Sequence, residues 1–377
     1  MNIRNYNLES LVKIAKRENN KKRSYLYVNV IQGKHMPVDP VISLNLFSIM
    51  AEQLEREYPG EKLLVIGFAE TATAIGASMA CKANNVSYYI NTTREIIPGS
   101  ECICFSEVHS HASEQKLVVD GLSEAIKQVD RIVFAEDEVT TGNTIKNLIR
   151  MLNQKFPGDV KRFTIISILN SMSLNRIREF REKGIECLYI FKIPEKYRHN
   201  DIEKYKYEKL TSSFTGCCCY KFKLIDIYGR WNSRIVCNIN TIQKKLQLFI
   251  QQLLHKVSDF DLHGKILILG TEEFMFPAIM FGEALKNNDQ DISVMMHATT
   301  RSPIEISTDV QYPLHKRWTL RSMYDSQRIT YVYNLEKYDT VFIVTDAQQI
   351  RDESISDLLG ALQNIGNTEI ILVRWLN

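Results

Sequence analysis

The sequence predicts an α/β fold made of two Rossmann-like, doubly wound domains with mostly parallel sheets. Short apolar runs of strand length, such as residues 63–67, alternate with longer segments whose apolar residues repeat at helical spacing. This alternation is typical of a parallel sheet that helices cover on both faces. The chain has 377 residues, more than one typical core uses, and this length indicates two domains.

Composition argues against several classes of partner. Hydrophobic residues make up 45% of the chain and charged residues 24%, which is ordinary for soluble globular proteins. A net charge of +3 is too near neutral to indicate nucleic acid or an anionic membrane as a partner. No apolar run approaches the span of a bilayer, and the N-terminus lacks a signal-peptide core, so we expect a cytoplasmic location.

The eight cysteines do not form a disulfide framework in a chain of this length. The cluster Cys217-Cys218-Cys219 lacks the Cys-x-x-Cys or histidine pair that would complete a zinc set. We interpret these residues as buried reduced thiols, with a redox or metal role as the open alternative.

The first predicted domain spans residues 1–238 and begins with an amphipathic, basic segment over residues 1–24. Its expected strands lie at 25–31, 63–67, 86–90, 132–135, 163–169 and 185–191, with helices at 41–58, after 73, after 144 and at 173–183. A polar loop carries Lys34 and His35, which either reach a phosphate or a base or belong to a solvated connection. Residues 192–230 are irregular, and we expect them to finish this domain and to wall an acceptor pocket.

One stretch of this domain suits a sugar phosphate. Glu136 and Asp137 follow the apolar run at 132–135, where the predicted strand ends. They could accept protons from ribose hydroxyls or hold a hydrated Mg²⁺. The next residues form a hydroxyl-rich turn and open a helix whose N-terminal amides and dipole favour a phosphate: Thr140, Thr141, Gly142, Asn143 and Thr144. The alternative is a plain crossover with an acidic turn and a threonine N-cap.

Two other strand ends carry candidate anion ligands. The predicted strand at 63–67 runs into a tight turn and a helix that opens with threonines, which makes either an anion cradle or a capping box with small residues. Arg94 leaves the next strand and is suited to fork onto a phosphate, or equally to pair with a surface carboxylate.

The stretch at 130–144 resembles the phosphoribosyl-pyrophosphate (PRPP) motif of type I phosphoribosyltransferases. The resemblance implies a pyrophosphate loop formed by Ala69, Glu70, Thr71, Ala72 and Thr73. It also implies a mobile hood before residue 116 that closes over PRPP. His109 and His111 are candidate hood acids, because histidine titrates near neutrality. Orotate-type hoods use a lysine, for which this sequence offers Lys116, so the acid stays unassigned.

A helical linker at 239–260 leads to the second predicted domain at 261–377, which repeats the first in outline. Residues 270–273 repeat the glycine and glutamate spacing of residues 67–70. Thr299-Thr300-Arg301 repeats residues 92–94, and residues 339–346 repeat residues 130–137. A duplicated unit is one interpretation, and convergence of short motifs in unrelated domains is the other. Residues 350–352 do not preserve the phosphate turn, so we do not expect this copy to bind PRPP. We expect a second site, a ligand cradle or a lid, at Glu273, Thr299, Thr300 and Arg301.

The run from Thr299 to Pro303 resembles the Thr-Arg-Ser-Pro motif that names a C-terminal domain, TRSP, of a bacterial two-domain group. In that group the TRSP domain follows an orotate-phosphoribosyltransferase-like domain, and the resemblance covers nearly the whole chain. It implies an association with tellurium-resistance and stress-response gene clusters that encode ATP-grasp and HAD-type enzymes. It also implies a role in the synthesis of a nucleoside-like metabolite.

Taken together, the motifs predict a Mg²⁺-dependent phosphoribosyltransferase that joins PRPP to a nucleobase-like acceptor, with a homodimer as a possible assembly. Purine 6-oxo enzymes usually carry an aspartate where this chain has Thr140, which argues against hypoxanthine or guanine as the acceptor. A non-enzymatic PRPP sensor and a purely structural α/β module are the competing hypotheses.

Overall fold

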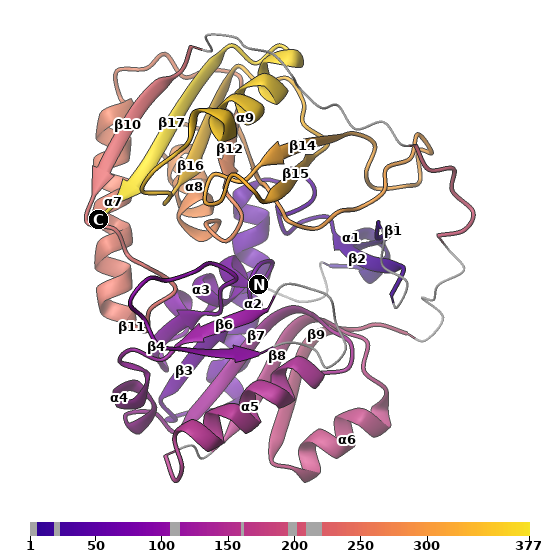
Figure 1. Cartoon of the computed structure of the whole chain (residues 1–377), viewed down its shortest axis with the longest axis vertical. Coiled ribbons are helices and arrows are strands. Elements are labelled where there is room, and N and C mark those ends of the chain that lie inside the picture. The colour runs from indigo at the N-terminus through magenta and orange to yellow at the C-terminus, as the bar shows by residue number, and fades with distance from the viewer. Residues whose placement is uncertain (1–5, 19–22, 106–113, 160–161, 195–201, 209–220) are drawn as a thin grey trace. The chain divides into compact units, whose positions relative to one another are not determined.

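The computed structural model describes residues 6–18, 23–105, 114–159, 162–194, 202–208 and 221–377 (Figure 1). The chain divides into two compact units. The first unit comprises residues 45–196 and 231–245, and the second draws on residues within 2–44, 197–230 and 246–377. No helix in the described part of the chain has the length and apolar character needed to cross a bilayer.

These units differ from the continuous domains that the sequence predicts at 1–238 and 261–377. The N-terminal segment belongs to the second unit, where Val38 and Met296 exchange two backbone hydrogen bonds of 3.0 and 2.7 Å. Within 192–230, strand β10 (Lys223–Tyr228) also joins the second unit rather than finishing the first, because it pairs in parallel with β17 (Glu369–Leu376). The expected linker is helix α7 (Ile239–Val257), and it contributes residues to both units.

The first unit is a six-stranded sheet in the order β11-β4-β3-β7-β8-β9. Every neighbouring pair is parallel except β11 and β4, which confirms the predicted doubly wound class. The bounds are β3 Leu63–Gly67, β4 Val86–Asn91, β7 Arg131–Val139, β8 Phe163–Asn170, β9 Ile185–Lys192 and β11 Cys237–Asn238. The helices are α2 Pro40–Glu57, α3 Thr73–Lys82, α4 Leu122–Lys127, α5 Asn143–Lys155 and α6 Leu174–Glu182, with α5 and α6 in front of the sheet in Figure 1.

Strand β7 is longer than the apolar run that predicted it. The expected strand stops at Ala135, with the carboxylates beyond its end. In the structure the ladder with β8 continues, because Glu136 lies opposite Ser167 and Glu138 opposite Leu169. The acidic residues are therefore part of the strand, and parallel pairing on both sides of its first half fixes the backbone that carries them.

A two-stranded hairpin follows β4, in a stretch around Lys116 where apolar residues show no periodic spacing. It consists of β5 (Cys102–Phe105) and β6 (Gln115–Val118), paired antiparallel. Its β6 strand also forms a bridge with the segment just after β4, where Thr93 and Lys116 exchange two backbone hydrogen bonds of 2.8 Å.

The second unit is built on a five-stranded sheet, β10-β17-β16-β12-β13, in which every pair is parallel. Its further elements are β12 Lys265–Gly270, β13 Ser293–Ala298, β16 Thr340–Thr345, α8 Phe276–Asn288, α9 Asp352–Asn364 and the hairpin β14 Arg317–Arg321 with β15 Ile329–Tyr333. The expected amphipathic leader instead forms a short helix, α1 (Leu8–Leu11), and a strand, β1 (Val12–Lys16), which pairs with β2 (Tyr25–Asn29).

The two sheets share their central strand order and register. The order β13-β12-β16-β17 in the second unit corresponds to β4-β3-β7-β8 in the first. Gly67, the last residue of β3, lies opposite Asn91 and Ala135, and Gly270, the last residue of β12, lies opposite Ala298 and Val344. Each unit therefore has loops after three corresponding strands at its carboxyl edge.

Candidate active site

The predicted site residues of the first unit converge on the carboxyl edge of its sheet. The chain leaves β3 for β4 on one side and later returns to β7 on the other side. Open α/β sheets bind ligands where the strand order reverses in this way. The loops after β4, β3 and β7 therefore stand side by side there, and they carry Arg94, residues 69–73 and residues 136–144.

The turn after β7 has a backbone that only glycine accepts readily. Gly142 has φ of 69°, in the left-handed region, and it directly precedes α5. A Cβ placed on Gly142 would lie 2.7 Å from a ring carbon of Phe180. Thr141 Oγ1 accepts a hydrogen bond from the amide of Asn143 at 3.3 Å, and Thr141 is exposed. The turn is thus packed against Phe180 at Gly142 and exposed to solvent at Thr141.

Arg176, on α6, holds this turn and was not predicted from the sequence. Its Nε donates to the Thr141 carbonyl at 3.1 Å, and its Nη2 donates to Asn143 Oδ1 at 2.6 Å. The guanidinium also lies over the ring of Phe180, 4.9 Å from its centroid. Because the contact joins the starts of two helices that are neighbours only in the folded sheet, no local pattern around Arg176 indicates it.

The two predicted carboxylates influence each other's protonation. Glu136 and Asp137 are half-buried neighbours on β7. Burial raises the pKa of Glu136 well above its ordinary value, and the adjacent Asp137 charge raises it further. Burial and the Glu138 carboxylate raise the pKa of Asp137 to about 6. A cation or hydroxyl donors at this point would relieve the repulsion that causes these shifts.

The loop after β3 is tied closely to its surroundings. Its Ala69–Glu70 peptide bond is cis, and Thr73 Oγ1 donates to the Glu70 carbonyl at 3.1 Å. Ala72 caps α3 without a side-chain hydrogen bond, so the capping-box alternative is wrong for this helix. The close packing of small residues that this alternative also predicts is present between α3 and β3, since a Cβ on Gly76 would lie 3.0 Å from the Cα of Gly67.

Thr92 links this loop to the β5–β6 hairpin and is a second residue that sequence reasoning did not single out for a site role. Its Oγ1 accepts from the Ala69 amide at 2.8 Å and donates to Gln115 Oε1 at 2.8 Å. Thr92 is completely buried. A signal for it existed, because the Thr-Thr-Arg run that begins at Thr92 recurs at Thr299.

The remaining predicted residues fall in different places. Arg94 is half-buried just beyond β4. His109, His111 and the Cys217–Cys219 cluster lie outside the described residues, so the hood acid stays a prediction.

Lys34 fits neither alternative that the sequence left open. It is buried in the second unit, where its ammonium donates to the carbonyls of Glu272 at 2.6 Å and Thr299 at 2.9 Å. The loop that carries Lys34 and His35 is therefore buried rather than a solvated connection, and it supports the second unit.

The second predicted site also lies at the carboxyl edge of its own sheet. Glu273 is in the loop after β12, while Thr299, Thr300 and Arg301 follow β13. Arg301 Nη2 lies 3.5 Å from Glu273 Oε1, so the structure brings these two side chains together.

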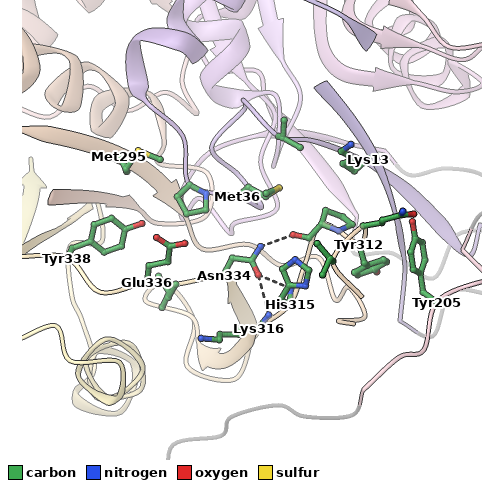
Figure 2. Close-up of a pocket in the computed structure, with 16 residues that line it drawn as sticks. Lys13, Met36, Tyr205, Met295, Tyr312, His315, Lys316, Asn334, Glu336 and Tyr338 are labelled. Carbon is green, nitrogen blue, oxygen red and sulfur yellow. Dashed lines mark hydrogen bonds between the residues drawn. The ribbon is translucent and has the colours of Figure 1, made fainter. Parts of the chain in front are cut away.

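A pocket of about 710 Å³ in the second unit is separate from all these residues (Figure 2). Met36, Met295, Tyr312 and Tyr338 line it, and Glu336 is among its polar residues. Most of its walls come from segments that precede β14 and β16 or lie in the N-terminal segment, not from the loops after β12 and β13. None of the predicted site residues lines it.

Family comparison agrees with the arrangement of motifs. Residues 11–189 match a family described as "Phosphoribosyl transferase", and residues 236–362 match one described as "TRSP domain C terminus to PRTase_2". The chain belongs to the phosphoribosyltransferase family in which a TRSP domain follows the transferase domain. The family and the domain order implied by the sequence resemblance are thereby confirmed.

Several solved phosphoribosyltransferases are similar to part of this family member. The adenine enzyme of Trypanosoma brucei, in complex with AMP, pyrophosphate and ribose-5-phosphate, is 13% identical with a TM-score of 0.40 and covers 54% of this chain and 87% of that chain. The Giardia lamblia enzyme with 9-deazaadenine is 11% identical, with a TM-score of 0.37. The match covers 52% of this chain and 99% of the Giardia chain. The hypoxanthine enzyme of Staphylococcus aureus is 20% identical, with a TM-score of 0.26. The match covers 40% of this chain and 73% of the Staphylococcus chain. The comparison with curated proteins found no match.

Proposed function

We propose that the first unit transfers ribose 5-phosphate from PRPP to a nucleobase-like acceptor and releases pyrophosphate. The observation that carries this proposal is the Glu136–Asp137 pair beside a glycine-containing turn at the start of α5. The carboxyl groups are suited to the ribose hydroxyls, and the amides that open α5 are suited to the 5-phosphate. Thr140, Thr141 and Thr144 add hydroxyl donors around that phosphate.

Mg²⁺ fits the chemistry of these donors. Proteins bind Mg²⁺ through one or two carboxylates together with substrate phosphates, rather than in a cage of side chains. No group of three or more His, Cys, Asp or Glu side chains that could hold a metal occurs among the described residues. Glu136 and Asp137 would hold the ion, which when bound would neutralise charge on the departing pyrophosphate.

The loop after β3 and Arg94 would hold the pyrophosphate. Residues 69–73 offer backbone amides at the start of α3, and Arg94 offers a guanidinium from the neighbouring strand. Bond cleavage at C1 of the ribose gives a transition state of oxocarbenium character. Nearby carboxylates stabilise such positive charge, so catalysis would consist mainly of positioning and electrostatics.

The acceptor is proposed to be a base other than a 6-oxopurine. Thr140 has no carboxylate to offer a purine ring nitrogen, and its side chain is half-buried beside the acidic pair. By resemblance to its two-domain group, the product would be a nucleoside-like metabolite.

The test is a screen of the full chain with PRPP, Mg²⁺ and a panel of nucleobase-like acceptors, with pyrophosphate release as the readout. The proposal predicts acceptor-dependent release that Asp137→Asn abolishes. Binding of PRPP without release across the whole panel would favour the sensor hypothesis instead. Absence of any PRPP-induced thermal shift with Mg²⁺ present would leave only a structural role.

A further inference from the structure

The loops at the carboxyl edges of the two sheets carry matching hydrogen bonds. In the first unit, Thr92 Oγ1 accepts from the amide of Ala69 at 2.8 Å. In the second unit, Thr299 Oγ1 accepts from the amide of Glu272 at 3.0 Å. Together with the shared strand register, this places Glu272 at the position that Ala69 occupies in the first unit.

The hairpins of the two units are attached in the same way. Thr93 exchanges two backbone hydrogen bonds with Lys116 on β6, and Thr300 exchanges two with Tyr331 on β15. The next residue in each case is an arginine, so Arg301 is the counterpart of Arg94.

The Glu272 carboxylate is bound as a phosphate group would be. Arg301 Nε lies 2.6 Å and Arg328 Nη1 2.9 Å from its Oε2, while the Ser322 hydroxyl donates to its Oε1. Glu272 is 1% exposed, and its φ of 48° lies in the left-handed region that a glutamate rarely adopts. Two guanidinium groups and a hydroxyl around one buried anion are the donors that proteins use for phosphate.

We propose that the Glu272 carboxylate occupies, in the second unit, the place of a phosphate or pyrophosphate ligand. The second unit therefore retains an anion site of the same architecture as the first, filled by its own side chain. Ala69, at the corresponding position of the first unit, has no carboxylate.

The acid on the neighbouring strand is paired internally as well. Asp346 corresponds in register to Asp137, and it accepts from Arg230 Nη1 at 2.7 Å and from the Tyr324 hydroxyl at 2.7 Å. Asp346 is 2% exposed. Internal partners thus occupy both halves of the second site, so we expect wild type to bind no pyrophosphate there.

The test is calorimetric titration of the full chain with pyrophosphate, comparing wild type with Glu272→Ala. Removing the carboxylate leaves the guanidinium groups of Arg301 and Arg328 beside the vacated space, with Glu273 Oε1 still 3.5 Å from Arg301 Nη2. We expect the variant to bind one pyrophosphate per chain more than wild type does, and Glu272→Ala/Arg301→Ala to lose that gain. Because the gain is counted relative to wild type, it does not depend on whether the first unit turns over PRPP.

Asp357→Ala is the matched control. It frees the guanidinium of Arg321, whose Nε and Nη2 donate to Asp357 on α9 at 2.8 and 2.7 Å, and no added binding is expected because Glu272 still fills the space beside Arg301 and Arg328. Glu272→Gly also empties this space and suits the positive φ of 48° at this position, so it decides the question if circular dichroism shows that Glu272→Ala is unfolded. An unchanged stoichiometry in a folded Glu272 variant, or an equal gain in Asp357→Ala, overturns the proposal.

Discussion

Glu136 and Asp137 are adjacent acids on one strand, and their chemistry follows from that placement. Side chains of neighbouring strand residues ordinarily point to opposite faces. Here the two residues nevertheless affect each other, because the charge of Asp137 raises the pKa of Glu136. Their raised pKa values express the cost of two like charges in a half-buried position, and this cost falls when a cation or a sugar hydroxyl approaches.

Replacing Asp137 tests this pair at the level of one atom. Asp137→Asn keeps the side-chain shape but removes the charge, and we expect kcat/KM for PRPP to fall by about 100-fold or more. Because the pKa of Asp137 is raised to about 6, the wild-type kcat/KM should rise between pH 5 and pH 7 as that carboxyl loses its proton. Glu124→Gln on the exposed surface of α4 is the control. Wild-type activity in Asp137→Asn would exclude the assigned role.

The two hydrogen bonds of the Thr92 hydroxyl, from the Ala69 amide and to Gln115 Oε1, give a second prediction at this scale; we call them the Thr92 relay. Gln115→Leu removes the acceptor of the Thr92 hydroxyl and weakens the link between β6 and the amide of Ala69. We expect a rise of about 10-fold in KM for PRPP, the loss of a typical net hydrogen bond, and a loss of about 1–3 kcal/mol in unfolding free energy because the buried Thr92 hydroxyl loses its acceptor. Gln115→Glu retains an acceptor oxygen and should behave much more like wild type. Equal effects of the two variants on KM would argue against the relay.

The sequence indicates candidate residues where local chemistry is distinctive, but not where contacts are tertiary. The acids, the threonine turn and Gly142 could be named because strand, turn and helix signals follow each other in the sequence. Arg176 and Gln115 could not, since the first reaches across from another helix and the second lies in a stretch without periodicity.

At the scale of elements, the junction between β7 and α5 depends on one glycine. Gly142 satisfies a backbone requirement, with φ of 69°, and a packing requirement, because Phe180 of α6 lies directly beneath it. The apolar residues that repeat along α5 are buried, so the helix is held by its packed face, and the turn sets where its free amides stand.

Gly142→Ala should therefore be costly. A left-handed alanine costs about 1–2 kcal/mol, and overpacking against Phe180 adds about 1–3 kcal/mol to the loss in unfolding free energy. Gly158→Ala is the matched control, because Gly158 also has positive φ, 85°, but a Cβ there meets nothing within 4 Å. It should lose only the first of these contributions. Equal midpoints in urea for the two variants would contradict the packing argument.

For the whole molecule, local patterns predicted two parallel sheets but not which segments belong to each. The alternation of strands and helices identified both sheets, whereas the domain boundaries depend on pairings between distant residues. Val38 with Met296, and β10 with β17, are such pairings, and no local signal specifies them. The N-terminal segment is consequently a structural part of the second unit.

His297 links that segment to the second sheet and makes the unit sensitive to acid. Its Nε2 lies 2.7 Å from the Tyr333 carbonyl and its Nδ1 3.5 Å from the Gly33 carbonyl. Burial lowers the pKa of His297 to about 4, below the ordinary value near 6.5. The unfolded chain therefore takes up this proton first as pH falls, and the stabilising contribution, complete above pH 6.5, is lost towards pH 4.

We expect this effect to remove about 3 kcal/mol of unfolding free energy between pH 6.5 and pH 4. Urea denaturation across this range, followed for wild type and His297→Gln, measures it. The variant should have a shallower dependence on pH whatever its absolute stability. Parallel pH curves for the two proteins would show that His297 does not contribute.

The central claim is that the first unit binds a phosphorylated pentose through its acids and its threonine turn. Calorimetric titration of the full chain with PRPP in the presence of Mg²⁺ measures this binding without requiring the acceptor. The account predicts one PRPP per chain and an affinity at least about 10-fold weaker in Asp137→Asn, as expected for loss of a charged contact. Equal PRPP affinity in wild type and Asp137→Asn, or no binding by folded wild type, would contradict it.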